Sequence, residues 1–505
     1  MTSPHRPERR EFLRATGALA ATGFLGRTVL GRQSHAPAGP RAPASAALRR
    51  IEIDLVAAPG TAQLFPGTPT AVFRYTGTLV AGNGTELIPV PNSHLGPILN
   101  LRRGQELVVR LSNQLGEPHC THWHGLDVPA DMDGHPLDGY ASGTSRTYAF
   151  EIENRAGSYW YHPHTDMLTA EQVYKGMAGL LLVSDAEEQA LALPRGAYDV
   201  PLVLQDYNFD ASNQFLYTTT GMIGFLGNTM VVNGWPNAVL PVATRVYRFR
   251  VYNGSQSRIY KLVWDDGTPL VVIGSDGGLL AAPRTYPYVM LSPGERVELW
   301  ADFRNKPLGA QIRLRSLAFF GAGGTNGSSQ LDLLTLSVAS QQPETLVLPT
   351  TLSSITPYDP LAAINAGNPR TFAISFDMAG GSFLLNGASF QGSAVAANEI
   401  VKRDTLEIIR ITNTAGPLTV AHPIHFHGRQ FQVLDRTNVS GNAANYAAVK
   451  DGYQDEGWKD TVMLMPGEEI RILMRYTRHT GLFVYHCHNL VHEDMGMMRN
   501  LRIDP

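Results

Sequence analysis

The residues near the C-terminus combine the side chains that bind a redox-active copper ion. Residues 485–497 read Tyr-His-Cys-His-Asn-Leu-Val-His-Glu-Asp-Met-Gly-Met. A copper ion that cycles between two oxidation states favours a cysteine thiolate and two imidazoles in a trigonal set, with a weak axial methionine. Cys487, His492 and Met497 supply three of these ligands, so the pattern predicts such a site with one more histidine from upstream. The axial thioether favours the cupric state and predicts a moderate redox potential.

The histidines that flank Cys487 indicate a second metal site. Successive side chains of a β-strand lie on opposite faces, so Cys487 would bind one metal while His486 and His488 bind another on the far side. Three more His-x-His pairs can each offer two imidazoles to that second site, and one further histidine precedes the last pair; they are His122 and His124, His162 and His164, His425 and His427, and His422. One such pair is a weak signal, because a strand histidine is more often a half-buried structural residue. Four pairs together predict a metal cluster.

These motifs resemble those of the three-domain multicopper oxidases, which include laccases, bilirubin oxidases, spore-coat laccases and periplasmic cuprous oxidases. The resemblance rests on four segments that match in identity, order and spacing: HWHG at 122–125, WYHPH at 160–164, HPIHFHG at 422–428 and HCHNLVHEDMGMM at 486–498. It implies four coppers per chain, of which the type 1 copper is bound by His422, Cys487, His492 and Met497. It further implies a type 2 copper bound by His122 and His425, and a type 3 pair bound by His124, His162, His164, His427, His486 and His488.

Length and composition indicate an all-β protein of several domains. The chain has 505 residues, too many for one core, and its 49 glycines and 33 prolines are typical of short strands joined by many turns. An alternating segment that ends in Asn occurs at 108–113, 248–253 and 408–413, which indicates three related β-sandwiches. Together with the resemblance, this predicts three tandem cupredoxin-like Greek-key β-sandwich domains, at residues 48–186, 187–350 and 351–505.

The predicted ligands occur only in the first and third of these domains. The histidine cluster must therefore lie where those two domains meet, and the second domain would be a spacer and part of the substrate wall. Metal held between domains stabilises only the assembled protein, so we expect copper binding and folding to be linked.

Two acidic residues near the motifs are candidate proton donors. The resemblance implies that the cluster reduces dioxygen to water, a reaction that consumes protons as well as electrons. Asp133, eleven residues after His122, and Glu493, directly after His492, match positions where related enzymes hold carboxylates near the cluster. We therefore expect both to act as catalytic proton relays. The alternative is that Asp133 is a turn residue and Glu493 a structural or solvated charge.

The chain has only two cysteines, so disulfides cannot form the framework of the fold. Pairing Cys120 with Cys487 would remove the predicted thiolate ligand, and Cys120 is therefore expected to be a free, buried thiol. It lies two residues before His122, on the same strand face, which leaves open a role beside the copper ligands.

The N-terminus predicts export. Residues 8–14 read Glu-Arg-Arg-Glu-Phe-Leu-Arg and are followed by an apolar stretch at 15–26, an arrangement that resembles a twin-arginine signal. The apolar stretch is shorter than the roughly 20 residues that span a bilayer, so no stable membrane span is expected. We predict a signal and a Pro/Ala-rich linker at residues 1–47, recognition by the twin-arginine translocation machinery, and a periplasmic or extracellular location. The alternative is a disordered basic tail.

The predicted function is a laccase-like oxidase that couples one-electron oxidation of phenolic or similar aromatic donors to reduction of dioxygen. Cuprous oxidases of the resembled family carry a methionine-rich insert, whereas residues 350–401 contain only Met378, which disfavours a metal-ion oxidase of copper homeostasis. Val420 stands where bilirubin oxidases typically have Trp. A structural or cell-division protein on this fold would lack copper ligands, and an electron-transfer or copper-storage protein would not need four His-x-His pairs. The net charge of −3, without basic blocks beyond the N-terminus, argues against nucleic-acid binding.

Overall fold

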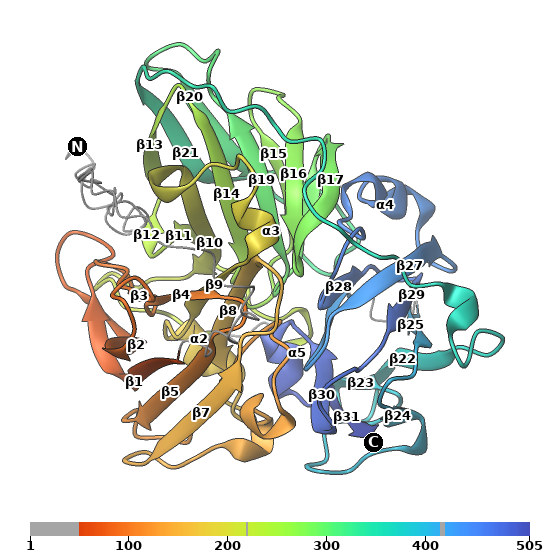
Figure 1. Ribbon diagram of the computed structural model, residues 1–505. Helices are drawn as coiled ribbons and strands as arrows, with labels where there is room; N and C mark the ends of the chain where they lie inside the picture. The colour runs from red at the N-terminus through yellow and green to blue at the C-terminus, as the bar shows by residue number, and fades with distance from the viewer. Residues whose placement is uncertain (1–49, 219–220, 415–419) are drawn as a thin grey trace, which may run out of the picture.

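The computed structural model describes residues 50–505 except 219–220 and 415–419, and within these residues strands form six sheets. The predicted all-β class is confirmed. Three successive stretches of the chain each form two of these sheets. We name them the first unit (50–184), the second unit (199–340) and the third unit (370–504). Figure 1 shows them in orange, green and blue. The domain boundaries at 186 and 350 stay predictions, and the predicted export signal lies outside the described residues.

The first unit pairs a sheet of order β2-β1-β5-β7 with one of order β3-β4-β9-β8-β6. Alternate residues of the first strand, beginning at Ile51, are fully buried, as expected for a strand with one face on a core. The elements are β1 (Arg50–Ala62), β2 (Thr70–Ala81), β3 (Leu87–Ile88), β4 (Ile98–Arg102), β5 (Glu106–Asn113), β6 (Thr121–His122), η1 (Ala130–Met132), η2 (Pro136–Asp138), β7 (Ser145–Glu151), β8 (Gly157–Pro163), α2 (Thr169–Tyr174) and β9 (Gly179–Ser184).

The second unit contains the sheet with the most strands among the described residues, of order β12-β11-β10-β14-β19-β16-β17. It packs on a sheet of order β13-β21-β20-β15-β18. The short helices α3 (Ala186–Gln189) and η3 (Gly196–Tyr198) precede it. Its elements are β10 (Asp199–Tyr207), η4 (Gly221–Ile223), β11 (Thr229–Val232), β12 (Trp235–Pro236), β13 (Val239–Ala243), β14 (Val246–Asn253), β15 (Tyr260–Trp264), β16 (Leu270–Ser275), β17 (Gly278–Tyr286), β18 (Val289–Leu291), β19 (Arg296–Asp302), β20 (Gln311–Ser316) and β21 (Leu331–Ser340).

The third unit pairs a sheet of order β23-β22-β25-β29-β27 with one of order β24-β31-β30-β26-β28. The helix η5 (Pro360–Ala362) lies before it in the chain. Its elements are β22 (Arg370–Asp377), β23 (Ser382–Leu385), η6 (Ala397–Glu399), β24 (Ile400–Lys402), β25 (Glu407–Asn413), β26 (His422–Phe426), β27 (Phe431–Asn438), α4 (Ala443–Ala447), η7 (Lys450–Gly452), β28 (Thr461–Leu464), β29 (Glu468–Met474), β30 (Gly481–Cys487), α5 (Leu490–Asp494) and β31 (Met498–Asp504).

The internal repeat corresponds to one strand in the same position of each unit. The repeated segments form β5, β14 and β25, each parallel to the first long strand of its unit and antiparallel to a later one. Each ends in an asparagine whose side-chain amide donates to two backbone carbonyls of other segments of the unit; these are Asn113, Asn253 and Asn413. Asparagine suits this position because its side-chain amide has two N–H groups, which can bond two backbone carbonyls at once.

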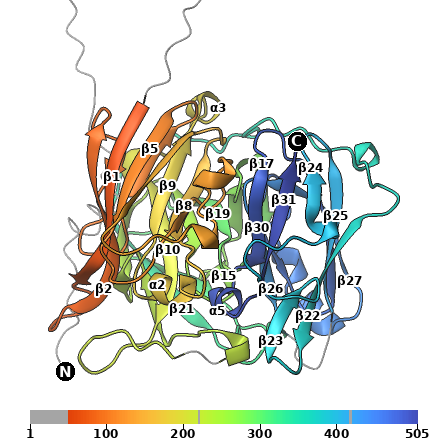
Figure 2. The same cartoon turned by 90° about the horizontal axis from the view of Figure 1, so that it is seen from below.

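The three units contact one another through buried polar groups. Ser158 of the first unit donates to Glu298 of the second over 2.6 Å, and the amide of Gly277 in the second unit donates to the carbonyl of Trp458 in the third over 2.7 Å. The first and third units meet where α2 lies beside α5 (Figure 2), and Asp494 accepts the amides of Thr169 and Ala170 there. In the described part of the chain no helix is both long and apolar enough to cross a membrane.

Candidate metal centre

Two pairs of antiparallel strands carry the His-x-His motifs. In the first unit β6 pairs with β8 so that His122 is opposite His162. In the third unit β26 pairs with β30 so that His425 is opposite His486 and Ile424 is opposite Cys487. In each pair the two opposed histidines lie on one sheet face, and because side chains alternate along a strand, Cys487 of β30 lies on the face opposite His486.

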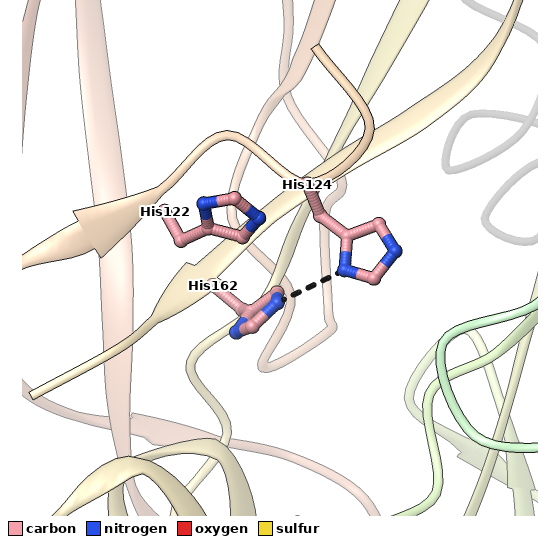
Figure 3. Close-up of side chains that lie close together, drawn as sticks. All are labelled: His122, His124 and His162. Carbon is pink, nitrogen blue, oxygen red and sulfur yellow. Dashed lines mark hydrogen bonds between the residues drawn. The ribbon is translucent and has the colours of Figure 1, made fainter. Parts of the chain in front are cut away.

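The structure brings the eight histidines of these motifs together between the first and third units. Ring nitrogens approach closely across the interface, at 3.2 Å from His164 to His486 and 3.4 Å from His122 to His425. Within the first unit, Nδ1 of His124 lies 3.4 Å from Nε2 of His162 (Figure 3). None of the eight side chains is more than 1% exposed. So many converging imidazoles, all shielded from solvent, form a site for more than one metal ion.

Several nitrogens of this histidine cluster have no hydrogen-bond partner among the described residues. They include both ring nitrogens of His488 and Nδ1 of His164. The His488 ring lies 4.9 Å from that of His124 and 5.4 Å from that of His162, measured between centroids. Buried polar atoms are normally satisfied, so orphaned imidazole nitrogens that face other imidazoles fit metal ligands.

Hydrogen bonds to oxygen acceptors decide which nitrogen each ring presents to the centre. Nδ1 of His122 donates to the Asp133 carbonyl over 2.8 Å, and Nδ1 of His425 donates to the Asp460 carbonyl over 2.9 Å. A carbonyl can only accept, so each Nδ1 carries the proton and Nε2 is left for a metal. His124 is reversed, because its Nε2 lies 3.1 Å from a carboxylate oxygen of Asp460 and its Nδ1 faces His162.

A second cluster contains the thiol. Sγ of Cys487 lies 3.5 Å from Nδ1 of His422 and 3.7 Å from Nδ1 of His492. Met497 belongs to the same buried cluster, and its carbonyl accepts the Cys487 amide over 3.0 Å. One thiol with two imidazoles directed at it, and a methionine packed nearby, is the donor set of a mononuclear copper site.

The outer edge of His492 is covered by the second unit. Its Nε2 donates to the carbonyl of Met222 in η4 over 3.1 Å, and its side chain is only 1% exposed. The side-chain amide of Asn489 donates to the neighbouring carbonyl of Ile223. The second unit thus helps to close this cluster from solvent; its expected role as part of a substrate wall stays a prediction.

The two predicted acidic residues both lie against the histidine cluster. A carboxylate oxygen of Asp133 accepts from Nδ1 of His427 over 2.7 Å, and the side chain is fully buried. One oxygen of Glu493 lies 3.0 Å from Nδ1 of His486, and the other lies 3.6 Å from Nε2 of His164. Asp133 is thus more than a turn residue, and Glu493 is not a solvated charge.

Burial prepares the donor groups for a metal. Six histidines of the cluster have pKa values lowered well below the usual range, first by loss of water and then by their neighbours; they are His124, His162, His164, His425, His427 and His488. These six imidazoles are therefore neutral and able to bind a metal. Burial raises the pKa of the Cys487 thiol, so the metal itself must displace that proton.

Sequence profiles of one family match both ends of the described chain. Profiles with the description "Multicopper oxidase" match residues 73–188 and 362–505, the segments that contain every residue of the two clusters. The chain belongs to the multicopper oxidase family. Its cupredoxin fold and its standing in a family of copper-binding oxidoreductases follow from this membership.

Curated relatives of this multicopper oxidase differ in what they do. The chain is 32% identical to the bilirubin oxidase of Albifimbria verrucaria, over 80% of this chain and 70% of that protein. It is 31% identical to the laccase of Bacillus subtilis, over 88% of this chain and 89% of that protein. It is also 27% identical to the cell division protein FtsP of Xenorhabdus nematophila, over 98% of each.

Solved multicopper oxidase structures have the same fold along most of the chain. McoA from Aquifex aeolicus is 30% identical with a TM-score of 0.78, over 90% of this chain and 96% of that one. A multicopper oxidase from Campylobacter jejuni, named a metallo-oxidase, is 26% identical with a TM-score of 0.74, over 92% and 93%.

The sequence did not predict that Asp460 and Met222 contact the two clusters. Asp460 contacts one histidine of the first unit and one of the third, but it has no ligand-like spacing to any motif. Met222 approaches His492 only through its backbone, which no side-chain pattern reveals. Cys120 is a free, buried thiol as predicted, and its sulfur faces the carbonyls of Gly134 and His135.

Proposed function

We propose that this multicopper oxidase is laccase-like: it oxidises phenolic or similar aromatic donors one electron at a time and reduces dioxygen to water. The observation that carries the proposal is the complete donor set of the two buried clusters, joined by the sequence His486-Cys487-His488. Copper, when bound, supplies one-electron transfer at the thiol cluster and dioxygen reduction at the histidine cluster.

The proposal assigns four coppers to these residues. The type 1 copper takes the thiol cluster, with Met497 as its axial ligand, and the type 2 copper takes His122 and His425. The type 3 pair takes the remaining histidines, which the ring contacts divide into two sets of three; these are His124, His162 and His488, and His164, His427 and His486.

The chain's own groups would perform three tasks. The peptide bonds from Cys487 to His486 and His488 form a short covalent path between the clusters. The closed interface excludes water from the reacting oxygen. Glu493 and Asp133 stand beside ring N–H groups of the cluster, where each can hold and pass on a proton for water formation.

The covered type 1 cluster favours aromatic donors. Nε2 of His492 is already bonded to the Met222 carbonyl, so a donor that approaches this edge of the cluster meets that backbone first. Phenols and aromatic amines can release an electron without bonding to His492, whereas a metal ion that needs a protein ligand finds this nitrogen occupied. Metal-ion oxidation is therefore the second candidate, and oxidation of bilirubin the third, because Val420 is buried where bilirubin oxidases typically have Trp.

The resemblance to FtsP raises a non-enzymatic alternative, a structural protein of cell division. Such a protein has no need for neutral, buried imidazoles around Cys487 and Glu493. The complete donor set therefore favours the oxidase. We also propose export by the twin-arginine machinery to the periplasm or beyond, on the sequence of residues 8–26.

Copper content and oxygen uptake test the proposal. Protein loaded with copper under limiting oxygen should contain four coppers per chain, have an intense blue thiolate band, and consume oxygen with a phenolic donor without releasing peroxide. Cys487→Ser should lose the blue band and the oxygen uptake together. One copper or none in the wild-type protein, with no oxygen uptake, would reject the oxidase in favour of the structural role.

A further inference from the structure

A buried arginine of the second unit reaches the histidine cluster through Asp460. One carboxylate oxygen of Asp460 lies 3.1 Å from Nε2 of His124, and its carbonyl accepts Nδ1 of His425 over 2.9 Å. Asp460 therefore touches a histidine from each of the two units that form the cluster. Its side chain is 1% exposed, and an isolated carboxylate at that depth would be strongly disfavoured.

Arg296, the first residue of β19, provides the opposite charge. Its Nη1 and Nη2 each donate to a different oxygen of Asp460 over 2.6 Å, a bidentate pair. The remaining donors go to three carbonyls, with Nε bonded to Ser158, Nη1 to Gly294 and Nη2 to Asp276. All five N–H groups of the guanidinium are thus used, so the group is held rigidly by the first, second and third units at once.

The neighbouring residues form a matching pair with the charges exchanged. Lys459, which precedes Asp460, contacts Glu295, which precedes Arg296, over 2.9 Å. Lys459 also lies 3.0 Å from Asp276, whose other oxygen accepts the Arg296 amide over 2.8 Å. Glu295 and Arg296 of the second unit are therefore paired with two consecutive residues of the third unit. These two ion pairs fix the position of Asp460 relative to the second unit.

The glycine of the HWHG motif makes room for this pair. Gly125 has a φ of +87°, and a Cβ placed there would lie 2.6 Å from a carboxylate oxygen of Asp460 and 2.7 Å from Nη2 of Arg296. The backbone that follows His124 thus packs directly against the ion pair. This contact is independent of the hydrogen bond between Asp460 and His124.

The consequence is visible in the orientation of His124. The rings of His122 and His425 donate through Nδ1 and present Nε2 to the centre, whereas His124 donates through Nε2 and presents Nδ1. The nearest acceptor to this Nε2 is the Asp460 carboxylate at 3.1 Å, and Oγ1 of Thr461 lies 3.4 Å away. An Asp460 that is free to rotate would release the ring to either orientation.

We propose that Arg296 is a positioning residue for the trinuclear copper site. Within the described residues it forms no hydrogen bond with an expected ligand, but it holds Asp460 so that His124 presents Nδ1 to the type 3 pair. The second unit, which supplies no expected ligand, is then part of the copper site and not only a spacer. The inference rests on the copper assignment of the proposed function.

Copper loading of Arg296→Met tests this role without relying on turnover. Copper per chain, the electron paramagnetic resonance signal of type 2 copper and the near-ultraviolet band of the type 3 pair report the trinuclear site, and the blue band reports the type 1 site. The variant should keep the blue band while copper affinity at the trinuclear site falls at least about tenfold. Arg296→Lys keeps the charge but not the planar fork, and should restore part of that affinity.

Arg248→Met is the matched control. Arg248 is also fully buried in the second unit, where it pairs with Glu298 over 2.6 Å and with Glu188 over 2.7 Å, but within the described residues it forms no hydrogen bond or ion pair with Asp460. It should lose stability and still load the trinuclear site. If Arg296→Met fails to fold, Arg296→Lys decides, because it should still bind trinuclear copper several-fold more weakly than the wild-type protein.

Three results would overturn the inference. The first is trinuclear loading of either Arg296 variant equal to that of the wild-type protein, and the second is an equal loss of copper in Arg248→Met. Either would leave the proposed function standing, because the wild-type protein would be fully loaded. The third is a wild-type protein with no trinuclear copper, which would overturn the proposed function together with the role of Arg296.

Discussion

At the scale of single residues, position decides what a carboxylate does. Glu493 is 2% exposed and lies beside two histidines of the cluster, and it follows His492 of the other cluster directly in the chain. Asp133 bonds His122 through its backbone carbonyl and His427 through its side chain. Both are close enough to move protons, but Asp133 also orients two rings, so Glu493 gives the cleaner test of proton transfer.

Glu493→Gln should slow dioxygen reduction by about a hundredfold, since a general acid or base typically contributes at least that much. The amide keeps the shape of the side chain but cannot carry the proton. Stopped-flow measurements should find anaerobic reduction of the type 1 copper unchanged and reoxidation by dioxygen slowed. Equal reoxidation rates in the variant and the wild-type protein would remove Glu493 from the relay.

Met497→Leu should raise the redox potential of the type 1 copper. The thioether donates electron density that favours the cupric state, and leucine removes that donor. Because the two side chains are similar in volume, the variant should lose less than about 1.5 kcal/mol of stability. Redox titration of the blue band gives the potential; an unchanged or lower value would show that Met497 is not the axial ligand.

At the scale of the elements, the turn that contains Asp133 and Gly134 packs against the strand that begins the HWHG motif. Gly134 has a φ of +81°, and a Cβ there would lie 2.1 Å from the carbonyl oxygen of Thr121 in β6. The turn therefore packs directly on the backbone that carries His122, and it places Asp133 between His122 and His427. Only glycine permits both the conformation and the close approach.

Gly134→Ala should lower the free energy of unfolding by about 1–3 kcal/mol or more and reduce trinuclear copper loading, because the clash displaces β6. Gly143→Ala is the matched control, since Gly143 has a φ of +83° but no atom within 4 Å of its added Cβ. It has the same conformational cost without the clash. Urea unfolding and copper analysis of both variants make the comparison; equal copper loading would contradict the prediction.

At the scale of the whole molecule, the units also enclose histidines that belong to neither metal-binding cluster. His94 bonds Gln205 across the contact between the first and second units, and His119 bonds Gln172. Burial lowers the pKa of each to about 4. The folded protein therefore resists protonation at both sites, whereas the unfolded chain takes up those protons near the ordinary pKa of about 6.5.

The metal-free protein should lose stability as the pH falls from about 6.5 to about 4. The unfolded state binds more protons in that window, so the stability that is fully present above it declines by on the order of 3 kcal/mol per histidine. Urea unfolding of chelator-treated protein at several pH values measures the slope. His94→Gln should flatten it, and a profile with no slope in the wild-type protein would contradict the prediction.

Much of the site could be predicted from the sequence because strand geometry is simple. Alternation along a strand puts both histidines of a His-x-His pair on one face and Cys487 between two others on the opposite face. The resemblance added the partition of the histidines, and the structure brings all of them into two clusters with His422, His492 and Met497 on the expected side. The repeated segments that end in Asn indicated three sandwiches for a similar reason, since each is one alternating strand.

The sequence by itself determined the donor types, their spacing and the all-β class, because these depend on residues close in the chain and on the period of a strand. Only the tertiary structure decided what surrounds the donors. Arg296 and Asp460 are 164 residues apart, and His492 and Met222 are 270 apart. Neither pair leaves a local pattern, because a salt bridge or a backbone carbonyl works at any sequence separation once folding has brought the units into contact.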